Sequence, residues 1–97
     1  MPRKNRAETV DATLTARGRT HGDFAACAAC SQSILRAMRA GPSWGRLSDV
    51  QIEALQMISH KLHRIACGDP DHADHWHDIA GFATLVERWL ESNKDAK

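Results

Sequence analysis

Two aspartates and two basic residues in the C-terminal half have the types and the spacing for chemistry. Asp74 and Asp78 lie four positions apart, which places both on one side of a helix, and Lys61 and Arg64 lie three positions apart. Mg²⁺ takes oxygen ligands, and two carboxylates can hold it together with waters and substrate phosphates. Lysine and arginine bind phosphate oxygens. The set predicts a metal site at Asp74 and Asp78 and phosphate binding by Lys61 and Arg64.

An ion pair is the structural alternative for the same residues. A short turn near 69–70 is expected to join two helices as an antiparallel hairpin, and equal steps from that turn set Lys61 level with Asp78. A half-buried charge needs a partner. Asp74 would then only complement the dipole at the start of its helix. The sequence leaves both interpretations open.

Helices must position these side chains. Apolar residues recur at three- and four-residue spacing, and no alternating strand pattern occurs, which is typical of an all-α fold. We expect a single domain over residues 1–97, with Gly18 ending the first helix and with loose tails at 1–5 and 92–97. The expected helices cover about 6–16, 23–39, 49–67 and 72–91.

Local signals mark the starts of the third and fourth helices. Ser48 and Gln51 have the spacing of a capping box, in which each side chain satisfies a backbone donor. Gly68 is expected to end the third helix. In Asp69-Pro70-Asp71, proline suits the first helical position and aspartate suits the cap.

Core positions follow from helical spacing. In the second helix the expected core side contains Phe24, Cys27, Ser31, Ile34, Leu35 and Met38. One side of the fourth helix carries Asp74, Asp78, Gly81, Phe82, Leu85 and Trp89. A second side carries Trp76, Ile79, Ala83, Val86 and Leu90. A helix that is apolar over so much of its girth must be covered by more than one partner. We therefore expect a homo-oligomer, with a homodimer as its simplest form.

Bulk composition excludes several classes. A formal charge of +1 lacks the basic surplus of a nucleic-acid-binding protein. No stretch approaches the apolar length of a membrane span, and the charged first residues do not form a secretory signal. Three cysteines, an odd number, fit a reducing compartment. We expect a cytoplasmic protein without a membrane partner, in which His72, His75 and His77 are solvated.

Two segments, 21–24 and 60–85, resemble a small uncharacterised family of phage and prophage proteins. Its hallmark is Lys-x-x-Arg, a short turn, and then Asp-x-Trp-x-Asp-Ile-Ala-Gly followed by an aromatic residue. The residues that match are Lys61, Arg64, Asp74, Trp76, Asp78, Ile79, Ala80, Gly81 and Phe82. Phe82 and His21 stand where the family more often has tyrosine. The resemblance covers about 17–90 and implies a phage or prophage accessory protein, without a function to transfer.

A more distant similarity is to the MazG-like all-α nucleotide pyrophosphohydrolases, which bind Mg²⁺ through two acidic pairs on consecutive helices. Asp49 with Glu53 and Asp74 with Asp78 are the corresponding pairs here, although both have the wrong internal spacing. This similarity implies Mg²⁺ as a cofactor and a nucleotide as a ligand, and it assigns no catalytic residue.

Two functions of different class follow. The first is a MazG-like, Mg²⁺-dependent nucleotide pyrophosphohydrolase or a nucleotide-binding relative. The alternative is a non-enzymatic protein-binding module, for example a phage inhibitor of a host enzyme or defence system. Trp44 and Trp76 would form its contact surface, because tryptophan is enriched at interface hot spots.

Overall fold

The protein is all-α. The computed structural model describes residues 6–21 and 23–94, and these contain no strand. They form four helices, α1 (Arg6–His21), α2 (Phe24–Arg39), α3 (Asp49–Cys67) and α4 (Ala73–Asn93). A short 3-10 turn, Trp44–Arg46, lies between α2 and α3. The expected fold class is confirmed.

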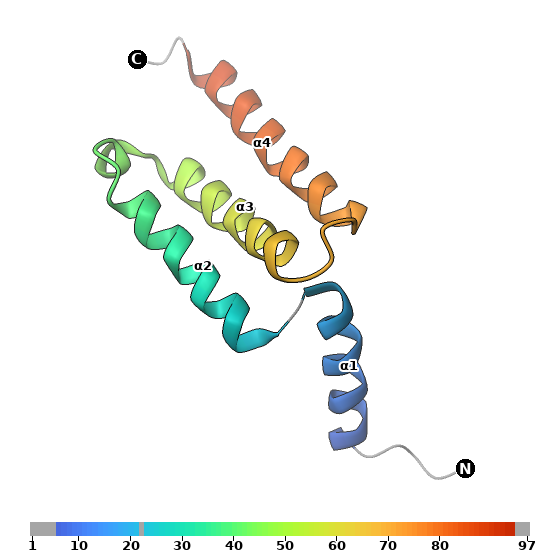
Figure 1. The fold of residues 1–97 in the computed structure, drawn as a ribbon. Coiled ribbons are helices and arrows are strands. Elements are labelled where there is room, and N and C mark those ends of the chain that lie inside the picture. Colours follow the sequence, from blue (N-terminus) through green and yellow to red (C-terminus); the bar gives the residue numbers. More distant parts are fainter. Residues whose placement is uncertain (1–5, 22, 95–97) are drawn as a thin grey trace.

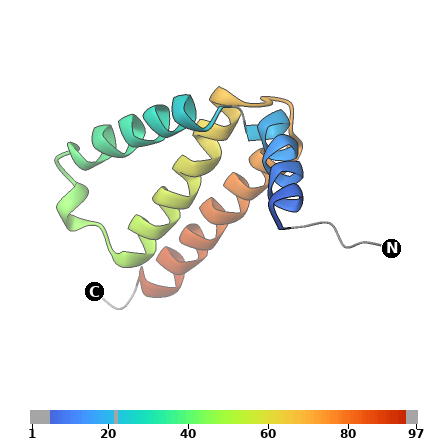
Figure 2. The ribbon, with the colours of Figure 1, turned by 90° about the horizontal axis from the view of Figure 1, so that it is seen from below.

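Helix α3 lies in the middle of the fold, with α2 on one side and α4 on the other (Figure 1). Helices α3 and α4 form the expected antiparallel hairpin. Figure 2 shows that α2 crosses α3 at an angle and diverges from it toward loop 40–48. Helix α1 lies at the end where the α3–α4 turn is, and it contacts α2 and α3. The result is an open layer of helices.

The first two helices differ in part from the expectation. Helix α1 passes through Gly18 and ends at His21, so the prediction that Gly18 ends it is wrong. A glycine inside a helix costs only about 1 kcal/mol relative to alanine, which the surrounding turns can absorb. Helix α2 begins after Asp23, which is its N-cap and accepts a hydrogen bond from the Ala26 backbone N–H at 3.0 Å.

Helix α3 has the expected bounds because its end signals are local. The Ser48 hydroxyl accepts from the Gln51 backbone N–H at 3.2 Å, and the Gln51 side chain accepts from the Ser48 backbone N–H at 2.9 Å. The capping box is therefore confirmed. At the other end, Gly68 is the C-cap, and its N–H donates to the Arg64 carbonyl at 2.9 Å.

Helix α4 starts differently from the expectation. His72 is its N-cap and makes no side-chain capping bond, so the prediction of an aspartate cap with Pro70 in the first turn is wrong. Asp69 instead accepts from the Asp71 N–H at 2.9 Å, which stabilises the turn. Trp76 Nε1 reaches back and donates to the Pro70 carbonyl at 2.8 Å. These two local hydrogen bonds fix the turn that leads into α4.

The C-terminal end also runs further than expected. Helix α4 continues to Asn93, whose side chain donates to the Trp89 carbonyl at 2.8 Å, so the predicted tail does not begin at Ser92. The predicted tails at 1–5 and 95–97 lie outside the described residues.

The buried core is small. The described residues that are buried are Cys27, Ser31, Leu35, Ala54, Ser59 and His75. Half of them are polar. Phe24, expected in the core, is the first residue of α2 and is 87% exposed, so that prediction is wrong. The radius of gyration, 17.4 Å, exceeds the value of about 13 Å for a compact domain of this length. The fold therefore leaves much apolar surface uncovered.

Candidate functional site

Lys61 and Asp78 meet between α3 and α4. Lys61 Nζ lies 3.0 Å from Asp78 Oδ2, as the counting from the turn predicted. The Lys61 side chain is 14% exposed and the Asp78 side chain is 40% exposed. The hydrogen bond from Lys61 holds the pKa of Asp78 below its ordinary value, although desolvation of the carboxylate opposes this effect. The charges of Lys61, His77 and His75 also lower the pKa. Asp78 is therefore ionised and paired at neutral pH.

Asp74 lies one turn earlier on α4, in the first turn, and is exposed. The described residues contain no group of three or more histidine, cysteine or acidic side chains arranged to hold a metal ion. A site built from Asp74 and Asp78 alone would need waters and phosphate oxygens for the remaining positions. The Asp74–Asp78 metal site stays a prediction.

The two basic residues of the predicted phosphate site face different surroundings. Lys61 pairs with Asp78, whereas Arg64 lines a hollow between α1, α2 and α3. That hollow is lined by no residue of α4 in the described part of the chain. Phosphate binding by Lys61 and Arg64 together also stays a prediction, and Lys61 is not among the residues that line the hollow at Arg64.

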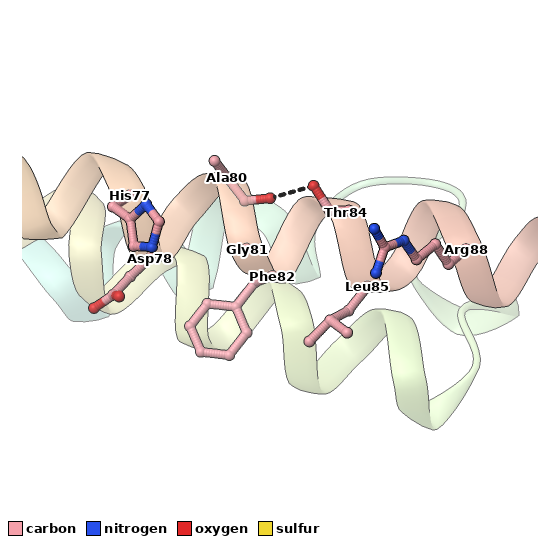
Figure 3. A pocket seen from close by; sticks show the side chains of 8 residues that line it. All are labelled: His77, Asp78, Ala80, Gly81, Phe82, Thr84, Leu85 and Arg88. Atoms are coloured by element: carbon pink, nitrogen blue, oxygen red, sulfur yellow. Dashed lines mark hydrogen bonds between the residues drawn. The ribbon is translucent and has the colours of Figure 1, made fainter.

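A shallow hollow of about 530 Å³ lies beside Asp78 (Figure 3). All of its lining residues come from α4, so it is a groove along one helix. Phe82 and Leu85 point to the same side of α4 as the Asp78 carboxylate (Figure 3). On another side, the Thr84 hydroxyl donates to the Ala80 carbonyl at 2.7 Å. An open groove of this kind excludes little water, so it lacks the enclosure that catalysis usually needs.

One of the three turn histidines is buried. His75 is 3% exposed, so the prediction that it is solvated is wrong; His77 is exposed and His72 is half-buried. His75 falls on the core face of α4 with Ile79, Phe82 and Val86, at spacings that the sequence already contained. The His72 and His75 rings meet edge to face, with centroids 4.6 Å apart.

His63 on α3 faces the hollow between α1, α2 and α3. Burial lowers its pKa, and the neighbouring charges of His60, Arg64 and His75 lower it further. The His60 and His63 rings are 5.6 Å apart, measured between centroids. Sequence reasoning missed this hollow because three helices form it. The close spacing of His60, His63 and Arg64 on one helix was the available signal.

The three cysteines come together. Cys27 and Cys30 on α2 both interact with Cys67 at the end of α3. Burial and the hydrogen bond with Cys67 raise the pKa of the Cys30 thiol. The hydrogen bond with Cys27, together with burial, raises the pKa of Cys67. Thiols in this state pack as small apolar groups and are poor nucleophiles at neutral pH.

The two tryptophans proposed for a partner surface differ in exposure. Trp76 is 55% exposed, although its indole N–H is bonded to Pro70. Trp44 is half-buried in the 3-10 turn. Of the two, Trp76 offers the larger apolar surface to a partner.

The helices of residues 6–21 and 23–94 do not reach the length and hydrophobicity that a membrane crossing requires. In comparisons with known proteins, no family model, no curated protein and no solved structure matches this chain.

Proposed function

We propose that this protein is a non-enzymatic protein-binding module that acts as a homodimer, joined through one side of α4. The observation that carries the proposal is a stripe on α4 that α3 covers along only one edge. We call it the α4 seam. It consists of Trp76, Ile79, Ala83, Val86 and Leu90.

The α4 seam has the spacing of a helix–helix interface. Its residues alternate steps of three and four, which is the heptad pattern that packs one helix against another. Ile79 and Val86 are half-buried against the rest of the fold. Trp76, Ala83 and Leu90 form the outer edge and are exposed, Trp76 by 55% and Leu90 by 43%. The outer edge is thus ready to pack against a further helix.

The exposed area favours a second copy as that partner. The chain exposes 7458 Å², whereas a compact monomer of this mass exposes about 5,500 Å². The excess of about 2,000 Å² is spread over the whole chain, and it leaves room for the ~800 Å² that each partner buries in a standard interface. A two-fold axis beside α4 would bring the same seam from both chains together, as in most homodimers.

The charged residues fit this function better than hydrolysis. Lys61 neutralises Asp78, and Arg64 turns to another part of the fold. The hydrolase hypothesis placed both basic residues at one phosphate.

Sedimentation equilibrium with two matched variants tests the proposal. Ala83→Glu places a charge on the outer edge of the α4 seam, and Thr84→Glu places the same charge on the neighbouring exposed position outside it. We expect the wild-type protein and Thr84→Glu to be dimers, and Ala83→Glu to be a monomer with unchanged helical content by circular dichroism. A monomeric wild-type protein at tens of micromolar, or equal masses for the two variants, contradicts the proposal.

A further inference from the structure

A hollow of about 780 Å³ lies where α1, α2 and α3 meet. Its volume falls in the range of about 300–1,000 Å³ that small-molecule sites occupy. Leu14 and Arg17 contribute from α1, and Arg64 contributes from α3. The start of α2 closes another side. The α4 seam is elsewhere, so this hollow is independent of the proposed dimer.

Positive charge prevails in the hollow. Arg17 and Arg64 enter from two different helices, and Asp23 is the single carboxylate among the lining residues that the structure describes. Asp23 Oδ2 already accepts the Ala26 N–H at 3.0 Å as the N-cap of α2. Guanidinium groups bind phosphate through two parallel hydrogen bonds, which gives both strength and geometry. The charges therefore suit an anion.

The environment of His63 also favours an anionic ligand. Its Nδ1 is buried, and no hydrogen-bond partner reaches that atom within the described part of the chain. Buried polar atoms are nearly always bonded, so an exception needs an explanation. Burial, and then the charges of His60 and Arg64, disfavour the protonated imidazole and lower the pKa of His63. An anion in the hollow would oppose the contribution of the two charges and would accept a bond from the protonated ring.

The apolar part of the hollow suits a flat ring. Phe24 lies at the rim and is 87% exposed, while Cys27 is buried and lines the hollow beside Ala28. Aromatic rings gain most by offset stacking on another ring. We propose that this hollow binds a small aromatic phosphate, with the phosphate at Arg17 and Arg64 and the ring against Phe24.

Three probes separate the two parts of the proposal. Adenosine monophosphate carries both a ring and a phosphate, adenosine carries only the ring, and inorganic phosphate carries only the anion. Titration of the full-length protein, followed by NMR or calorimetry, should show saturable binding of adenosine monophosphate. Adenosine should bind at least about tenfold more weakly, because one charge-assisted bond amounts to about a factor of ten. Inorganic phosphate should also bind more weakly, because it lacks the ring that stacks on Phe24. Equal binding of adenosine and its monophosphate, or no binding of the monophosphate, overturns the proposal.

Matched variants locate the site. Arg64→Gln should weaken adenosine monophosphate binding about tenfold or more, whereas Arg39→Gln, an exposed arginine at the end of α2, should not change it. Phe24→Ala should weaken binding of the monophosphate and leave phosphate binding unchanged. Because Phe24 is so exposed, this variant should keep the wild-type fold, which circular dichroism checks. Equal effects of Arg64→Gln and Arg39→Gln overturn the proposal.

Histidine NMR provides a readout that folding alone does not move. Bound adenosine monophosphate should raise the pKa of His63, since the added negative charge favours the imidazolium. Other charged and titratable groups surround this ring, and their effects must be distinguished from that of the ligand by NMR assignment or by variants. They are Arg17 on α1, Asp23 and Cys27 by α2, His60 and Arg64 on α3, and His75 on α4. An unchanged His63 pKa at saturating monophosphate overturns the assignment of the site.

Discussion

Lys61 on α3 and Asp78 on α4 are joined by a 3.0 Å ion pair that links the two longest of the described helices. The pair is asymmetric, because the Lys61 side chain is 14% exposed and the Asp78 side chain is 40% exposed. Water can solvate Asp78 without its partner far better than it can solvate Lys61. The energetic consequence of losing the pair therefore depends on which residue is removed.

We expect Asp78→Ala to destabilise the protein more than Lys61→Met. The first leaves a largely covered ammonium without a partner, and the second leaves a carboxylate that water still reaches. Urea unfolding of both variants and of the double variant gives the comparison. The double variant should be more stable than Asp78→Ala alone. The reverse order of the single variants would show that Lys61 does not depend on Asp78.

Stability should fall in acid in two separate pH ranges. The folded pKa values of His63 and Asp78 both lie below their ordinary values of 6.5 and 3.8, so the unfolded chain binds more protons and stability rises with pH. The His63 contribution should be lost as pH falls below 6.5 through its folded pKa. The Asp78 contribution should be lost below 3.8. Urea midpoints measured from pH 8 to pH 3 check this.

Single variants assign the two ranges. His63→Gln should flatten the upper range only, and Asp78→Asn should flatten the lower range only. An upper range that persists in His63→Gln would belong to another histidine.

Mg²⁺ at millimolar concentration should leave the melting temperature unchanged if the Asp78 carboxylate pairs with Lys61 and binds no metal ion. A ligand that binds the folded state stabilises it in proportion to the logarithm of its concentration. Calorimetric scans with and without Mg²⁺, on the wild-type protein and on Asp74→Asn, test this. A Mg²⁺-dependent increase that disappears in Asp74→Asn would instead favour the predicted metal site.

Gly81→Ala should stabilise the protein by about 0.5–1 kcal/mol, because alanine is the better helix former. A Cβ atom at Gly81 would meet no atom within 4 Å in the described part of the chain, so no steric cost opposes this gain. Thermal unfolding measures it. A loss of stability would indicate that another chain packs closely against this position, on the side of α4 away from the α4 seam.

Cys67→Ala should lower the pKa of the Cys30 thiol, because its hydrogen bond and its charge interaction with Cys67 raise that pKa in the wild-type protein. Alkylation with iodoacetamide, followed by peptide mass spectrometry from pH 7 to pH 10, measures the change. Cys30 should react faster at a given pH in the variant. An unchanged rate profile would attribute the raised pKa to burial alone.

Local features of the sequence were enough for much of the fold. The bounds of α3 follow from Ser48, Gln51 and Gly68, because caps act within one turn of the helix. The Lys61–Asp78 pair could be predicted because a short turn sets the register of two antiparallel helices. The failures were also local in part. Gly18 was predicted to end its helix, but the helix tolerates the free-energy cost of a glycine. His75 was predicted to be solvated, although the periodicity of α4 already placed it on the core face.

Periodicity and local capping signals were sufficient to predict four helices, the hairpin and the ion pair that the hairpin register implies. Which apolar residues are covered depends on how the helices pack, since Phe24 is exposed and α3 covers only one edge of the α4 seam. Packing also makes Arg64, but not Lys61, line the same hollow as Arg17, a residue 47 positions earlier in the chain. Periodicity reports the faces of one helix, whereas a cavity between helices depends on how three of them cross.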